Sequence, residues 1–206
     1  MGDITAESGA EFFPDDDPGN FKITTAEDLR RAQAFAGRAE PARVGYGLDV
    51  HALVPGRRLM LGGIEVPFAR GLAGHSDADV VLHAVADALL GAAGLGDIGR
   101  HFPDTDEAFK DADSAVLLAR VREMICAAGF GPVNVDVTIV AQEPRLALHL
   151  PRMQQRIAGV LGMAENAVNV KATTTEGLGF AGRGEGIAAH AVVLLAAEAR
   201  GPASGI

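Results

Sequence analysis

The sequence contains a single cysteine and fewer basic than acidic residues. Cys126 alone excludes an intramolecular disulfide and a cysteine-based zinc site. Its helical setting favours a small core residue over a reactive thiol. The formal net charge of −9 argues against nucleic acid or an anionic membrane surface as a general partner. A phosphate-bearing substrate remains compatible with this charge, because a metal ion and a few local donors can hold it.

The sequence also lacks a long apolar run. No segment approaches the roughly 20 residues of a membrane-spanning helix, no signal-peptide pattern opens the chain, and no internal repeat is present. We therefore expect a cytoplasmic protein. With 206 residues, of which 48% are hydrophobic and 22% charged, the chain fits a globular domain large enough for a hydrophobic core.

Residues 1–42 differ in composition from the rest of the chain. They hold nine acidic and four basic residues, a net charge of −5, against −4 for residues 43–206. We expect the first twenty residues to be disordered. Thr24, followed three positions later by Glu27, forms a capping-box pattern that predicts a short helix to about Ala36. We interpret this segment as an acidic appendage.

The remaining sequence predicts one domain over residues 43–197, followed by a tail over 198–206. Its fold class is α/β (α+β). We expect a mainly four-stranded sheet with some antiparallel pairs, and helices packed on one face of that sheet. The last apolar segment fits a strand or a helix, and we favour a strand that pairs with the others. Ser76 or Asp77 is the expected N-cap of the first helix in this domain. The predicted strands are 44–53, 59–61, 64–66, 133–140, 167–173 and 187–197, the helices 79–93, 113–128 and 149–161, and the long loops 71–78 and 94–112.

The central motif is an Asp-x-His pair on the first of these strands. Side chains two residues apart on a strand share a face, so Asp49 and His51 would project side by side. His83 lies on the first helix, four residues from both Asp79 and Asp87. An Asp, His, His set suits a catalytic zinc ion with an open fourth position. The alternative is that Asp49 caps a turn and the two histidines are ordinary, partly buried residues. The two flanking aspartates are a separate question, because they could either orient His83 as a metal ligand or form the solvated side of the helix.

Polar loops supply further candidates. His75 could donate to a phosphate or act in proton transfer, or be a solvated loop residue. The acidic residues of 102–106 could bind substrate hydroxyls, although Pro-Asp-Thr-Asp is also an ordinary turn. Segments 141–145 and 172–177 follow two strands and would meet at one sheet edge if these are parallel neighbours.

The groups in these last two segments suit phosphate or a nucleobase edge. Backbone amides and three consecutive threonines could bind either, and Glu176 could hold a hard divalent cation. Arg183, in a glycine-rich segment, could bind an anion. A run of threonines at a strand end and a surface arginine are the competing interpretation.

Together these stretches resemble one family. Residues 43–197 resemble 2-C-methyl-D-erythritol 2,4-cyclodiphosphate synthases of the non-mevalonate isoprenoid pathway. The resemblance implies a homotrimer with active sites between subunits. Its substrate would be 4-diphosphocytidyl-2-C-methyl-D-erythritol 2-phosphate, cyclised with release of CMP. The matching motifs are Gly45–His51, His75–His83, Gly96–Gly99, Phe102–Asp106 and Asn169–Glu176, in that order.

The resemblance also implies a role for each matching residue. Asp49, His51 and His83 would hold zinc, Glu176 would help hold Mg²⁺ or Mn²⁺, and His75 and Thr174 would stabilise the transition state. The implied substrate-binding set consists of Asp49, His51, His75, Ser76, Asp97, Ile98, Gly99, Phe102, Asp104, Asp106, Ala141, Pro144, Arg145, Leu146, Ala172, Thr173, Thr174, Thr175, Glu176, Phe180 and Arg183.

Two features depart from the family pattern. His190 stands where members often carry a glutamate near the trimer axis, so binding of an isoprenoid diphosphate in the central cavity beside Arg183 is in doubt. Residues 19–29 resemble the C-terminal end of 2-C-methyl-D-erythritol 4-phosphate cytidylyltransferase, which some bacteria fuse ahead of the cyclase. We interpret residues 1–42 as the remnant of such a fusion, too short for transferase activity.

Two rival functions remain at this point. A zinc-dependent phosphohydrolase would activate water and release a linear product. A trimeric isoprenoid-diphosphate binding protein would keep only a vestigial site. Retention of the Asp, His, His set together with His75 and Thr174 counts against the second rival.

Overall fold

The computed structural model describes residues 24–28, 42–103, 105–106 and 112–197, and the chain divides into two compact units, residues 1–39 and 40–206. In the first unit, Asp28 Oδ2 accepts hydrogen bonds from the backbone nitrogens of Thr24 at 3.0 Å and Thr25 at 2.8 Å, and the Asp28 nitrogen donates to Thr25 Oγ1 at 3.1 Å. This reciprocal cap pairs Thr25 with Asp28, one residue beyond the predicted pair of Thr24 and Glu27. The rest of the predicted appendage lies outside the described residues.

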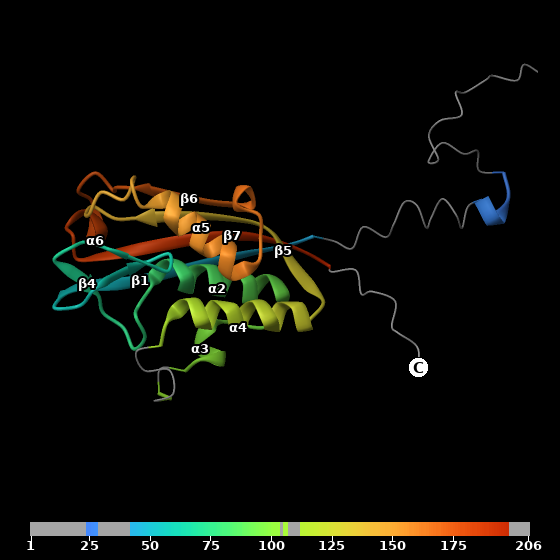
Figure 1. Ribbon diagram of the computed structural model, residues 1–206, viewed down its shortest axis with the longest axis horizontal. Coiled ribbons are helices and arrows are strands. Elements are labelled where there is room, and N and C mark those ends of the chain that lie inside the picture. Colours follow the sequence, from blue (N-terminus) through green and yellow to red (C-terminus); the bar gives the residue numbers. More distant parts are fainter. Residues whose placement is uncertain (1–23, 29–41, 104, 107–111, 198–206) are drawn as a thin grey trace, which may run out of the picture. The chain divides into compact units, whose positions relative to one another are not determined.

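The second unit is built on a five-stranded sheet (Figure 1). Its four long strands are those predicted from sequence. The short edge strand falls in the segment predicted as loop 71–78, where it pairs antiparallel with the end of the first strand. A separate hairpin joins β2 (Leu59–Leu61) and β3 (Ile64–Val66), as predicted. The sheet order is β4 (Arg70–Leu72), β1 (Arg43–Pro55), β7 (Gly186–Ala197), β5 (Phe130–Val140) and β6 (Val168–Thr173).

The helices include the three predicted ones. Asp79, rather than Ser76 or Asp77, caps the first of them, because its carboxylate accepts from Val81 N and Leu82 N at 3.1 Å each. Two further helices of four residues were not predicted, because they are too short to show an apolar period. One lies in the predicted loop 94–112 and the other in the glycine-rich segment before Arg183. No helix among the described residues is both long and apolar enough to cross a membrane. The helices are α2 (Val80–Ala93), α3 (Ile98–His101), α4 (Ser114–Ala127), α5 (Leu150–Leu161), α6 (Gly179–Gly182) and the 3₁₀ turn η2 (Glu165–Ala167).

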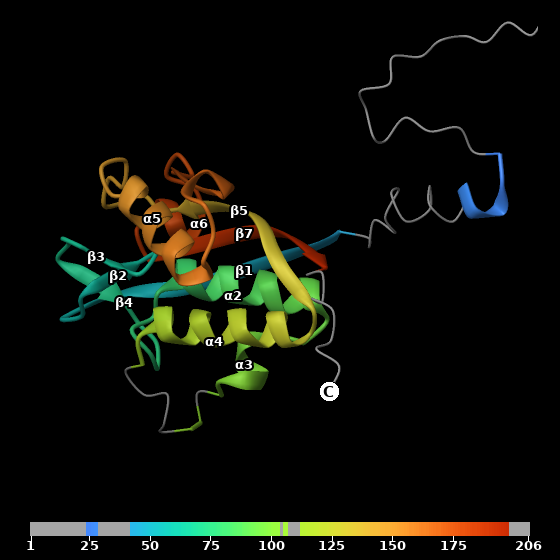
Figure 2. The same cartoon turned by 45° about the vertical axis from the view of Figure 1, so that its right-hand side comes forward.

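Helix α2 lies directly against β1, with α4 on its other side (Figures 1 and 2). The face of β1 toward α2 begins with two buried glycines, Gly45 and Gly47. A methyl group at Gly47 would lie 2.0 Å from the carbonyl oxygen of Ala84, and one at Gly45 would lie 1.9 Å from that of Ala88. Any side chain at these positions would therefore push the helix off the strand.

The first prediction concerns this contact. Gly47→Ala should lower the free energy of unfolding by roughly 3 kcal/mol, because the added methyl meets helix backbone that cannot rotate away. Gly91→Ala is the matched control on α2, where an added methyl meets nothing within 4 Å. It should be neutral or stabilise by up to about 1 kcal/mol through helix propensity. Urea unfolding of both variants measures the difference, and equal stabilities would show that the contact is loose.

Candidate metal centre and adjoining pockets

Three side chains from β1 and α2 converge in the second unit. Asp49 Oδ2 lies 2.9 Å from His51 Nε2 and 3.0 Å from His83 Nδ1, and these two nitrogens are 3.3 Å apart. All three residues are partly buried. Asp49 and His51 continue the face of β1 that carries Gly45 and Gly47, so close packing of α2 brings His83 to them. The predicted Asp, His, His cluster therefore forms a candidate divalent metal site.

The outer nitrogen of each imidazole is occupied by another partner. His51 Nδ1 lies 2.6 Å from the carbonyl oxygen of Ala73, and His83 Nε2 lies 2.9 Å from Ser114 Oγ. A carbonyl can only accept, so His51 carries its proton on Nδ1 and turns the lone pair of Nε2 toward the cluster. This donor set, one carboxylate oxygen and two imidazole nitrogens within 4.8 Å of one another, fits a divalent transition metal.

The electrostatics of the cluster keep Asp49 in the form that binds metal. Burial alone would raise the pKa of the Asp49 carboxyl, but the hydrogen bonds that His51 and His83 donate to it when their rings are protonated, together with the charge of those rings, hold it well below its usual range. Burial likewise opposes protonation of His51, yet the hydrogen bond and charge of Asp49 raise the pKa of His51. A carboxylate is therefore present at neutral pH.

The aspartates that flank His83 on α2 bind backbone amides instead. Asp79, fully buried, accepts from Gly62 N at 2.9 Å and Gly63 N at 2.6 Å as well as capping α2, and Asp87 accepts from Ile98 N at 2.7 Å. Burial raises the pKa of both carboxyls. Among the described residues, His83 Nε2 has two outer partners, Ser114 Oγ at 2.9 Å and Ser76 Oγ at 3.3 Å. The only signal for Ser114 in the sequence is its place at the start of a predicted helix.

The cluster opens into a pocket of about 450 Å³. Asp97 stands beside this pocket as the N-cap of α3, accepting from Arg100 N at 2.9 Å. The backbone oxygen of Asp106 lies 3.3 Å from His75 Nε2, and Asp104 lies outside the described residues. The predicted residues that line the pocket are Asp49, His51, His75, Ser76, His83, Ile98, Gly99 and Phe102.

A second pocket of about 270 Å³ lies where β5 and β6 end. These strands are parallel neighbours, with Val140 opposite Thr173, so the loops after them leave the same sheet edge as predicted. No residue lines both this pocket and the first. The predicted residues that line it are Ala141, Pro144, Arg145, Leu146, Ala172, Thr173 and Thr174.

The remaining predicted residues lie near α6. Thr175 and Phe180 line a mainly apolar cavity of about 400 Å³ together with His190, whose Nδ1 lies 2.9 Å from the Tyr46 hydroxyl. Arg183 donates to both carboxylate oxygens of Glu185, at 2.8 and 3.0 Å. An anion bound by Arg183 would have to compete with this ion pair.

Glu176 adopts a left-handed backbone with φ of 51° and accepts from Thr174 Oγ1 at 2.8 Å. A positive φ is costly for a residue with a side chain. The hydrogen bond holds the Glu176 carboxylate beside the Thr174 hydroxyl.

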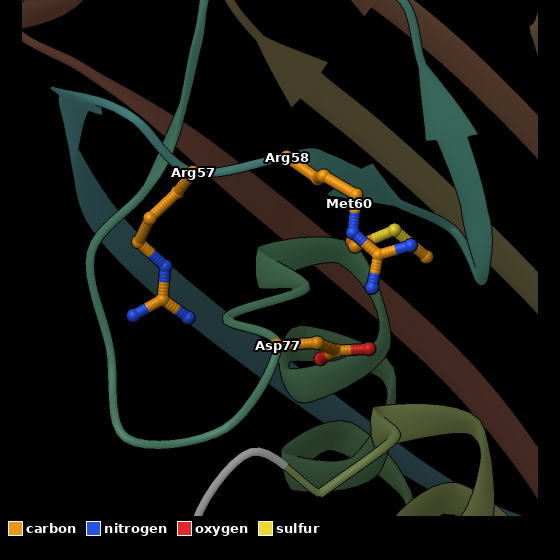
Figure 3. A pocket seen from close by; sticks show the side chains of 4 residues that line it. All are labelled: Arg57, Arg58, Met60 and Asp77. Atoms are coloured by element: carbon orange, nitrogen blue, oxygen red, sulfur yellow. The ribbon is translucent and has the colours of Figure 1, made fainter.

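Arg57 is a residue near the site that the sequence analysis missed. Its guanidinium donates to the carbonyl oxygens of Gly74 at 2.8 Å and Ser76 at 2.6 Å, on either side of His75. Arg57 and Arg58 project from one segment toward the loop that carries Asp77, around a cavity of about 300 Å³ (Figure 3). Nothing in the sequence distinguishes Arg57 from Arg58, because the contact depends on how two loops meet.

Known proteins are similar to this chain in both sequence and fold. The YgbB family model matches residues 42–196. The 2-C-methyl-D-erythritol 2,4-cyclodiphosphate synthase of Moorella thermoacetica is 63% identical over 153 residues, covering 74% of this chain and 94% of that protein. That of Thiobacillus denitrificans is 64% identical, covering 74% and 96%.

Solved structures agree with these relatives. A CDP-bound 2C-methyl-D-erythritol-2,4-cyclodiphosphate synthase matches with a TM-score of 0.69 and 35% identity, covering 74% of this chain and 99% of that one. The bifunctional IspDF from Campylobacter jejuni matches with a TM-score of 0.75 and 42% identity over 86% of this chain and 48% of its own. This chain thus spans about half of the bifunctional protein, and the larger share covered supports a fusion remnant at its N-terminus. The chain belongs to the YgbB family.

Proposed function

We propose that this chain converts 4-diphosphocytidyl-2-C-methyl-D-erythritol 2-phosphate into 2-C-methyl-D-erythritol 2,4-cyclodiphosphate and CMP, as a cytoplasmic phosphorus–oxygen lyase of isoprenoid precursor synthesis. The observation that carries the proposal is the Asp49, His51 and His83 cluster that lines the pocket, in a chain 63% identical to a synthase of that name. An oxygen of the 2-phosphate attacks the β-phosphorus, and the bond between that phosphorus and the oxygen bridging to the α-phosphorus breaks. CMP leaves with the bridging oxygen.

The reaction joins two anionic groups, so the chain must position them and offset their repulsion. Asp49, His51 and His83 would hold zinc, and Glu176 would help hold Mg²⁺ or Mn²⁺. When bound, these ions supply Lewis acidity and neutralise charge on the diphosphate. His75 lines the pocket beside the cluster and would donate a hydrogen bond to the charge that develops in the transition state. Thr174 donates its hydroxyl proton to the Glu176 carboxylate in this structure, and it would donate that proton to the transition state once the carboxylate holds an ion.

The two pockets divide the substrate between them in this proposal. The pocket at the metal cluster would hold the methylerythritol phosphate, using backbone and polar groups near Ser76, Asp97 and Gly99. The pocket after β5 and β6 would hold the cytidine and its phosphates, using the backbone of 141–146 and 172–174 and the Arg145 charge. The lining of this second pocket is apolar apart from a few polar groups, and such a lining suits a nucleobase.

We further propose that the enzyme is a homotrimer in which neighbouring subunits each contribute one of these pockets. Alternate side chains of β1 face away from the helices, and four of them are exposed hydrophobic residues. Their exposed fractions are 68% for Val44, 58% for Tyr46, 47% for Leu48 and 46% for Val50. A contiguous apolar strip of this kind is typical of a surface covered by another subunit.

The test of the reaction is CMP release with Mg²⁺, before and after zinc is stripped with a chelator, with the product identified by phosphorus NMR. We expect a cyclic diphosphate, a loss of rate of about a hundred-fold or more on stripping or in His83→Ala, and recovery of the stripped enzyme with zinc. Asp136→Asn, which changes an exposed carboxylate paired with Lys171, is the control and should keep full activity. A linear phosphate product would show that the protein is a phosphohydrolase and not a cyclase.

Shared active sites predict complementation between inactive chains. Asp49→Ala and Thr174→Ala should each be inactive alone. After the two are mixed, dissociated and reassembled, about one site in four should combine an intact half from each chain and recover activity. Sedimentation analysis should give the mass of three chains. Recovery that stays at zero, with mixed trimers demonstrated by mass spectrometry, would mean that each site belongs to one chain.

Arg57 should hold the His75 loop in place. Arg57→Ala removes two charge-assisted hydrogen bonds to carbonyl oxygens, which should cost about 2 kcal/mol of stability and increase amide exchange in residues 74–76. Arg58→Ala is the neighbouring control, because Arg58 is exposed and makes one long contact of 3.4 Å with Glu65. It should change stability by less than about 0.5 kcal/mol. Identical exchange in the two variants would contradict the role of Arg57.

A further inference from the structure

The starting observation is a buried hydroxyl behind the candidate metal centre. Ser114, at the first position of α4, is 1% exposed. Its Oγ lies 2.9 Å from His83 Nε2, the nitrogen that faces away from Asp49. Ser114 Oγ also donates a short hydrogen bond to Asp77 Oδ1. Asp77, Ser114 and the His83 ring thus form a chain of contacts, and the other ring nitrogen of His83, Nδ1, faces the candidate metal site.

The directions of these hydrogen bonds follow from the groups themselves. An ionised carboxylate can only accept, so the single hydroxyl proton of Ser114 goes to Asp77. The Ser114 oxygen is then left with lone pairs only, and it must accept from His83 Nε2–H. A neutral imidazole carries one proton, so His83 Nδ1 presents its lone pair to Asp49 and His51.

Asp77 is well placed to fix this arrangement. Its second carboxylate oxygen, Oδ2, accepts from the backbone nitrogen of Ser114 at 3.2 Å, and its own backbone nitrogen donates to the carbonyl of Ala112 at 3.1 Å. The Asp77 carboxylate therefore accepts hydrogen bonds from both the hydroxyl and the backbone amide of Ser114. Ser76 is the other hydroxyl near His83 Nε2, at 3.3 Å, and its oxygen also accepts from Ala78 N at 3.1 Å. The geometry favours Ser114 over Ser76.

We propose that Ser114 and Asp77 are positioning residues that hold the neutral His83 ring in the Nε2-protonated tautomer, so that its Nδ1 lone pair is available to a metal ion. Neither residue touches the reacting atoms. The proposal rests on the proposed function only in taking the cluster as a metal site, since the tautomer is a property of the chain alone. It also reassigns the orienting role that the sequence pattern suggested for Asp79 and Asp87.

The first test measures zinc affinity by competition with a chromophoric chelator on the full chain. Ser114→Ala should weaken zinc binding about ten- to a hundred-fold. Ser114→Thr, which keeps a hydroxyl, should restore most of the affinity and shows that loss of folding is not the cause. Ser76→Ala is the matched control, because it removes the other nearby hydroxyl, and it should change zinc affinity much less than Ser114→Ala.

The second test reads the tautomer without metal. Nitrogen NMR of the metal-free chain, labelled at its histidine rings and with the rings neutral, should show the His83 proton on Nε2. In Ser114→Ala the signal should shift toward a mixture of tautomers, whereas Ser114→Thr should match the parent. An unchanged tautomer and unchanged zinc affinity in Ser114→Ala would overturn the proposal. A parent chain with the Nε2–H tautomer but no zinc binding would instead reject the metal site and leave the hydrogen-bond assignment standing.

Discussion

The close contact of α2 with β1 is the constraint on which the rest of the site depends. One face of β1 presents, in order, two residues without side chains and then two side chains of the candidate metal site. The glycines let the backbone of α2 approach the strand, and the same approach carries His83 to within 3.0 Å of Asp49. A larger residue in the first half of the strand would therefore disturb the metal cluster in the second half. Packing and chemistry are set by one alternating pattern.

Once the three side chains meet, the charge of the carboxylate is decided within the cluster and the ring tautomers are decided from outside it. Asp49 keeps its charge because two imidazoles stabilise it against burial. His51 is oriented by the carbonyl of Ala73, and His83 has a hydroxyl at the corresponding place. Neither outer partner comes from β1, because Ala73 lies in the segment between β4 and α2 and Ser114 is the first residue of α4. The loops around the site thus do more than line a pocket, because they turn the ring nitrogens toward a common point.

The sequence predicted those parts of the site that follow from a local period. Alternation on a strand gave Asp49 beside His51, and the long strands and helices were recovered because their apolar patterns are extended. The helical stripe of Asp79, His83 and Asp87 was misleading as a guide to contacts. A shared stripe says which residues face the same way, but not what they meet. The turn between β2 and β3 meets Asp79. Arg57 escaped notice for the same reason, since its partners belong to another loop.

Strand direction gathers the candidate binding groups at one edge of the sheet without merging them. β1, β5 and β6 all run one way, because β1 and β5 are each antiparallel to β7 and β6 is parallel to β5. His51 and Val140 pair with adjacent residues of β7, so the candidate metal site and the end of β5 lie at the same level of the sheet. Three strand spacings, roughly 14 Å, still separate β1 from β6. The apolar outer face of β1 would remain in water in an isolated chain. Its burial would favour the trimer proposed above, in which the pockets of neighbouring chains would lie close together.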